Sequence, residues 1–71
     1  MDKDVTVNEL ADALLKLAKT KYHYPTESAM AFSYGTLTGL FESARWGFNS
    51  VQEIVDRKYA EIQKDLALSS Q

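Results

Sequence analysis

The chain has 71 residues, which suffice for one small domain with a limited hydrophobic core. Eight Lys and Arg against ten Asp and Glu give a net charge of −2, which argues against a general electrostatic affinity for nucleic acid or anionic membranes. The absence of Cys and the single His exclude disulfides, thiolate metal sites and histidine clusters. Oligomerisation is then the remaining way to stabilise so small a domain. We expect a single domain over residues 1–71, without metal or cofactor.

The compartment can also be anticipated from the sequence. The absence of Cys fits a reducing environment, and the acidic, charge-interrupted N-terminal stretch does not resemble a signal peptide. The longest uncharged run has fourteen residues, from Ser28 to Phe41, which is shorter than the roughly 20 that cross a bilayer. We therefore expect a soluble, cytoplasmic protein with no membrane partner.

The first predicted helix covers residues 7–21. Thr6 and Glu9 have the spacing of a capping box, in which each side chain accepts a hydrogen bond from the other residue's backbone N–H. Apolar residues then recur at helical spacing: Val7, Leu10, Ala11, Leu14, Leu17 and Ala18. The helix must stop by Tyr24, because the residue before Pro25 is disfavoured in helical geometry. Residues 1–5 are expected to be disordered.

The second predicted helix, over residues 25–46, is the longest and is expected to have neighbours on two sides. Its bulky apolar residues recur at alternating steps of four and three: Met30, Tyr34, Leu37, Phe41 and Ala44. Two interior glycines, Gly35 and Gly39, each cost about 1 kcal/mol relative to Ala. Either another element packs against the backbone there, or the helix is broken near Gly35. Gly47 is expected to end this helix in the left-handed conformation.

The third predicted helix covers residues 50–67, and Ser50 with Glu53 forms a second capping-box pattern at its start. Its inward face is predicted to hold Val51, Ile54, Val55, Tyr59, Ile62 and Leu66. Residues 69–71 are expected to be disordered. No alternating apolar and polar run predicts a strand. The sequence therefore predicts an all-α, antiparallel three-helix bundle with a long central helix.

Small residues form a second row along the middle helix, roughly opposite its bulky residues. The row consists of Ala31, Gly35, Gly39 and Ser43. Such a row lets another helix approach closely, and three occupants are possible: a helix of the same chain, a second copy, or a ligand. Aromatic residues beside a smooth backbone channel can anchor a partner helix. The predicted interface residues are Phe32, Gly35, Thr36, Gly39, Ser43 and Trp46.

Basic and aromatic residues are concentrated at the end of the first predicted helix. They are Lys19, Lys21, Tyr22, His23 and Tyr24. The lysines could contact phosphates while a tyrosine stacks on a base. Alternatively, the lysines complement the helix dipole and the tyrosines cover the end of the core. Further basic candidates for a nucleic-acid contact are Arg45, Arg57 and Lys58.

No arrangement of residues indicates catalysis. His23 has no Ser-His-Asp order, His-Glu motif or glycine-rich phosphate loop to work with, and the carboxylates are dispersed. We therefore predict a small, non-enzymatic interaction or assembly protein, whose partner is a second copy or another helical protein. The alternative is a regulator that binds nucleic acid or a nucleotide through residues 19–24.

Overall fold

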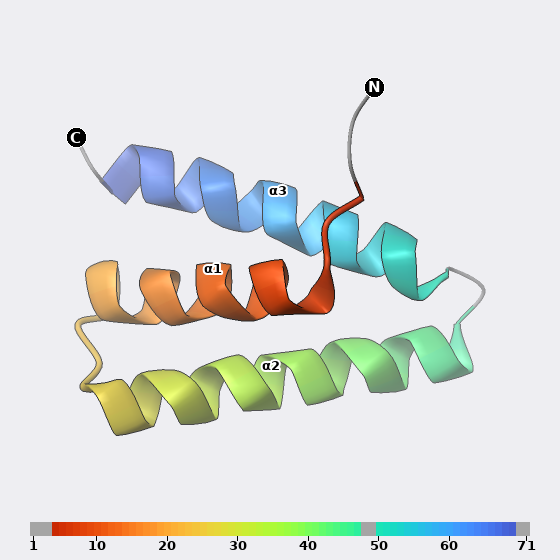
Figure 1. Cartoon of the computed structure of the whole chain (residues 1–71), viewed down its shortest axis with the longest axis horizontal. Coiled ribbons are helices and arrows are strands. Elements are labelled where there is room, and N and C mark those ends of the chain that lie inside the picture. Colours follow the sequence, from red (N-terminus) through yellow and green to blue (C-terminus); the bar gives the residue numbers. More distant parts are fainter. Residues whose placement is uncertain (1–3, 48–49, 70–71) are drawn as a thin grey trace.

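The computed structural model describes residues 4–47 and 50–69 (Figure 1). Its elements in chain order are α1 (Val7–Thr20), α2 (Thr26–Trp46) and α3 (Val51–Ser69). Consecutive helices run in opposite directions (Figure 1), which confirms the predicted all-α, antiparallel three-helix bundle. Since α2 is one continuous helix, the alternative of a break near Gly35 is wrong.

The start of α1 follows from its predicted capping box. The backbone N–H of Glu9 donates to Thr6 Oγ1, and the N–H of Thr6 donates to Glu9 Oε1, both at 3.1 Å. Two backbone donors that the helix itself cannot satisfy are therefore paired. Four residues of the predicted apolar stripe are buried as expected: Leu10, Leu14, Leu17 and Ala18. Ala13, which was not predicted, is buried too, whereas Val7 is exposed and Ala11 is half-buried.

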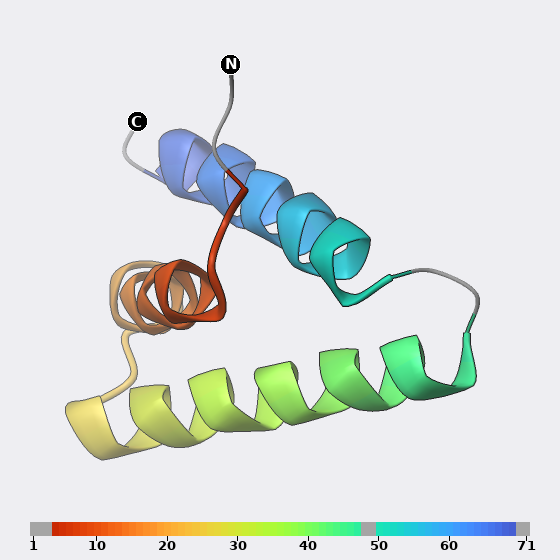
Figure 2. The same cartoon turned by 45° about the vertical axis from the view of Figure 1, so that its right-hand side comes forward.

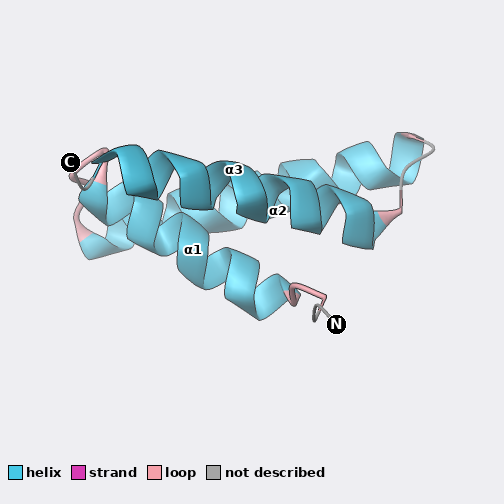
Figure 3. Cartoon of the chain, turned by 90° about the horizontal axis from the view of Figure 1, so that it is seen from above, coloured by secondary structure: helices cyan, strands magenta, loops and turns pink. Residues whose placement is uncertain are grey.

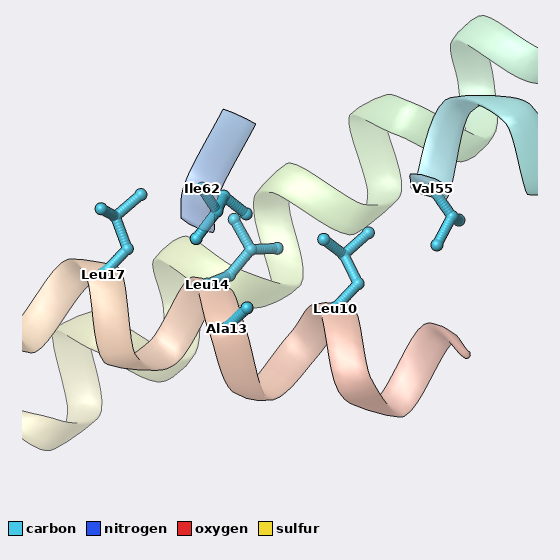
Figure 4. Close-up of a cluster of buried hydrophobic side chains, with 6 residues drawn as sticks. All are labelled: Leu10, Ala13, Leu14, Leu17, Val55 and Ile62. Atoms are coloured by element: carbon cyan, nitrogen blue, oxygen red, sulfur yellow. The ribbon is translucent and has the colours of Figure 1, made fainter. Parts of the chain in front are cut away.

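The core is centred on α1. Its leucines meet Val55 and Ile62 of α3 (Figure 4), and in the views of Figures 1 and 2 α1 lies between α2 and α3. On α2 only Ala29 and Ser33 are buried. The two expected neighbours of α2 are both present, but its contact with α3 is small, and α1 rather than α2 is the central helix. α1 takes that position because its apolar stripe is wide enough to pack against both other helices.

Small residues bring α1 and α2 together, although they are not the predicted ones. Ala29 is fully buried, and the hydroxyl of Ser33 donates to the carbonyl oxygen of Ala11 at 3.1 Å. Short side chains at this contact allow the two helices to approach closely, and the hydrogen bond satisfies a hydroxyl that is almost fully buried. The packed face of α2 thus lies between its bulky residues and its predicted small-residue row.

The helix ends differ from the predictions in detail. Pro25 is the N-cap of α2 rather than its first helical residue. Gly47 caps the C-terminus, with its N–H donating to the Ser43 carbonyl oxygen at 2.8 Å, but its φ of −103° is not left-handed as predicted. At α3 the N–H of Glu53 donates to Ser50 Oγ at 3.2 Å, which is one of the two bonds of the predicted capping box.

The segment before α1 is attached to α3. The N–H of Val5 donates to Asp56 Oδ1 at 3.3 Å, and Gln52 Nε2 donates to the Val5 carbonyl oxygen at 2.8 Å. Val5 also packs against the core. Of the residues predicted to be disordered, 1–3 and 70–71 lie outside the described residues, and Ser69 is the last residue of α3.

The bundle is flat. Its principal extents are 34 × 29 × 16 Å, and seen from above the helices cross rather than forming a parallel stack (Figure 3). The radius of gyration is 12.4 Å, whereas a compact chain of this length has about 11 Å. The flat shape follows from a small core centred on α1, and it leaves much of α2 uncovered.

Candidate interaction surfaces

The bulky residues of α2 form the largest exposed apolar surface of that helix. Met30, Tyr34 and Phe41 are 58%, 75% and 40% exposed, and Leu37 is half-buried between them in the helical spacing. We call Met30, Tyr34, Leu37 and Phe41 the bulky face. A soluble monomer rarely leaves such a contiguous set of large side chains in water, unless the surface serves an interaction.

The bulky face continues onto α1. A groove of about 230 Å³ runs between the two helices and brings Met30 and Leu37 next to Ala11 and Leu15 of α1. Ala11 and Leu15 are half-buried. They were not predicted to belong to an interaction surface, because their helical spacing alone places them in or beside the core stripe.

The small-residue row is open. Ala31, Gly35, Gly39 and Ser43 are all exposed, and a Cβ atom added at Gly35 or Gly39 would meet nothing within 4 Å. The alternative in which a helix of the same chain occupies this row is therefore wrong. Ala29 and Ser33, also four residues apart, fill that role instead, and their spacing is the sequence signal that could have identified them.

The predicted interface residues do not all share the open surface. Gly35, Gly39, Ser43 and Trp46 are exposed, whereas Thr36 is half-buried. Phe32 is also half-buried and packs against the core, so its ring is largely occupied within the chain.

Trp46 projects from the last turn of α2 and is 76% exposed. Its Nε1–H donates to Glu42 Oε2 at 3.3 Å, and the guanidinium of Arg45 lies 5.4 Å from its ring centroid. Both contacts come from the same helix, so they hold the indole along the helix surface without covering it.

The basic and aromatic segment covers one end of the bundle. The rings of Tyr22 and Tyr24 lie 5.7 and 6.0 Å from that of Phe32, both edge-to-face, and 5.7 Å from each other. Lys21 Nζ lies 3.7 Å from Asp65 Oδ2 of α3. These contacts fit the structural interpretation, in which the tyrosines cover the core. Nucleic-acid binding by this segment stays a prediction; Lys19 is exposed beside it.

The other basic candidates lie toward the opposite end of the bundle. A groove of about 300 Å³ between α2 and α3 is lined in part by Ser43, Arg57 and Lys58. Lys58 Nζ lies 3.8 Å from Glu61 Oε1, and Arg45 Nη1 lies 3.9 Å from Glu42 Oε1. Each of these two cations thus has an acidic neighbour on its own helix, and the structure does not join them to residues 19–24.

His23 has a structural peculiarity that the sequence did not reveal. Its φ is +59°, the left-handed region, and the N–H of the next residue, Tyr24, returns to the Ala18 carbonyl oxygen at 3.1 Å. His is one of the few residues other than Gly that adopt this conformation with some frequency. The turn that ends α1 therefore depends on His23 rather than on a glycine.

Replacing His23 by Gly is expected to raise the free energy of unfolding by about 0.5–1 kcal/mol, because Gly adopts positive φ without steric cost. Urea denaturation followed by circular dichroism measures the change. His23→Ala is the control, since it removes the imidazole but keeps the Cβ, and it should bring no gain. A loss of stability in the Gly variant would show that the imidazole itself stabilises the turn.

Across the described residues, no three His, Cys, Asp or Glu side chains gather closely enough to hold a metal ion. Among the helices that these residues form, none combines the length with the apolar character needed to cross a membrane. Comparison with protein-family models, with curated proteins and with solved structures finds no match in any of the three.

Proposed function

We propose that this protein is a small, non-enzymatic interaction or assembly protein of the cytoplasm, which self-associates through the bulky face and the small-residue row of α2. The main observation behind this proposal is the large solvent-exposed area of the chain. The chain exposes 5191 Å², whereas a monomeric protein of 8.0 kDa exposes about 4,450 Å². The difference, about 700 Å², goes with the flat shape of the bundle, which leaves much of α2 uncovered.

The nature of the exposed residues supports the same proposal. Met, Tyr, Phe and Trp are the residue types that interfaces favour, and α2 exposes one or more of each. The absence of Cys and the lack of a clustered metal site in the described residues leave association as the available means of adding stability to so small a core.

The mass in solution tests self-association directly. Light scattering behind a sizing column, over a wide range of protein concentrations, should give a mass that rises from 8.0 kDa towards at least twice that value. A mass of 8.0 kDa at every concentration would overturn the proposal of self-association.

A charge on the bulky face should weaken the association. Met30→Glu places a carboxylate where an apolar contact is proposed, and we expect a dissociation constant at least about tenfold higher, because a buried unpaired charge is costly. Leu68→Glu is the matched control, since Leu68 on α3 is 61% exposed against 58% for Met30. Equal effects of the two variants would contradict the involvement of the bulky face.

The small-residue row is tested by replacing Gly35 and Gly39 together with Leu. Both positions are exposed and an added Cβ at either meets nothing within 4 Å, so we expect the isolated chain to accommodate the larger side chains and to stay helical. Loss of self-association in a folded variant then implicates the row. Unchanged association would confine the interface to the bulky face.

A further inference from the structure

We infer that the bulky face of α2 pairs with the same face of a second copy in antiparallel orientation, with Glu27 of each copy beside Arg45 of the other. This inference rests on the proposed self-association and specifies its geometry. The supporting observations are the spacing of the bulky residues and the positions of the charges along the exposed side of α2.

The bulky face is symmetric in its spacing about one point of the helix, and each symmetric pair combines an aromatic with an aliphatic side chain. Met30 and Phe41 lie equally far on either side of a midpoint between residues 35 and 36, and so do Tyr34 and Leu37. In an antiparallel pair with its twofold axis at this point, Met30 would meet Phe41 of the other copy, and Tyr34 would meet Leu37. A twofold interface requires such self-complementarity of one patch.

The charges at the two ends of the bulky face are opposite in sign. Glu27 and Arg45 are 18 residues apart, which is five full turns of a helix, so they lie on the same side of α2. Their midpoint is residue 36, close to that of the apolar pairs. An antiparallel second copy therefore places Glu27 beside Arg45 at both ends, whereas a parallel copy places like charges together.

The existing contacts leave these two side chains available. Both are exposed, and within the described part of the chain no cation pairs with Glu27. Arg45 has a 3.9 Å contact with Glu42 on its own helix, an exposed i,i+3 pair of the kind that contributes little, and its guanidinium also lies 5.4 Å from the Trp46 ring centroid. Both contacts are exposed, so pairing with Glu27 of a second copy can replace them.

The surface open to a second copy is wider than α2 alone. The bulky face extends over Ala11 and Leu15 of α1, so the second copy would cover part of the groove between α1 and α2 as well as α2 itself.

Charge reversal tests the pairing. Glu27→Arg and Arg45→Glu should each raise the dissociation constant of the dimer about tenfold, because two symmetric ion pairs become two repulsions. The double variant should restore it to within about threefold of the original value, since the pairs are re-formed with reversed polarity. If the double variant lost as much binding free energy as the two single variants together, the inference would be overturned.

Cross-linking tests the orientation without relying on affinity. The chain has no Cys, so introduced thiols have no background. An equimolar mixture of Glu27→Cys and Arg45→Cys should form the mixed disulfide on mild oxidation, whereas neither variant alone should cross-link, because positions 27 and 45 are about 27 Å apart along the helix. Self-cross-linking of Glu27→Cys would show a parallel pair. A dimer without any cross-link would show that the two copies associate through another face. Either result overturns this geometry but is compatible with self-association. A chain that remains monomeric overturns both.

Discussion

Replacing Leu14 by Ala is expected to lower the free energy of unfolding by about 2–5 kcal/mol. Leu14 is fully buried at the centre of the core and reaches the α3 side of the bundle near Ile62 (Figure 4). A domain of this length is stabilised by only about 4–11 kcal/mol in total, so the variant loses a large share of its stability. The cavity would not be closed by rearrangement, because the core centred on α1 is small and few side chains can move into the empty space.

Urea denaturation at one fixed protein concentration measures this loss, since association would otherwise shift the midpoint. Leu68→Ala is the control for the same chemical change at a position that is 61% exposed, and its effect should stay within about 0.5 kcal/mol. If both variants lost the same stability, the core would not be centred on α1.

At a protein concentration low enough for the chain to be monomeric, the double replacement of Gly35 and Gly39 by Ala is expected to raise the free energy of unfolding by about 2 kcal/mol. Both glycines lie inside α2 with helical, negative φ, and an added Cβ at either meets nothing within 4 Å. The gain comes from helix propensity and from a less flexible unfolded chain. For a domain of this size the melting temperature should rise by roughly 8–16 °C.

Thermal unfolding followed by circular dichroism measures this rise. Ala31→Gly, in the same exposed row, is the reverse change and should lower the melting temperature by roughly 4–8 °C. A destabilised double Ala variant would mean that another molecule packs closely against the glycines under the conditions of the measurement. Comparing the melting temperatures at high and low protein concentration would then distinguish that intermolecular contact from an intrinsic property of α2.

The local features of the fold could be predicted from the sequence because they depend on neighbouring residues. Thr6 and Glu9 fixed the start of α1, and Pro25 separated α1 from α2, since both effects act over a few residues. The apolar spacing of α1 likewise predicted its buried face, because its charged residues leave one side free of charge. The left-handed residue of the turn, His23, could not be found this way, since its neighbours contain no glycine that would mark the position.

The number of helices, their approximate ends and the buried side of α1 follow from the sequence. The side of α2 that is covered depends instead on how the helices pack against one another. The fourteen residues from Ser28 to Phe41 carry no charge, so no charged residue marks the side of α2 that faces water, and the helical spacing left two candidate faces. The outcome was set by close packing against α1, which Ala29 and Ser33 permit and which the Ser33 hydrogen bond to Ala11 fixes. The bulky face and the small-residue row were thereby both left exposed.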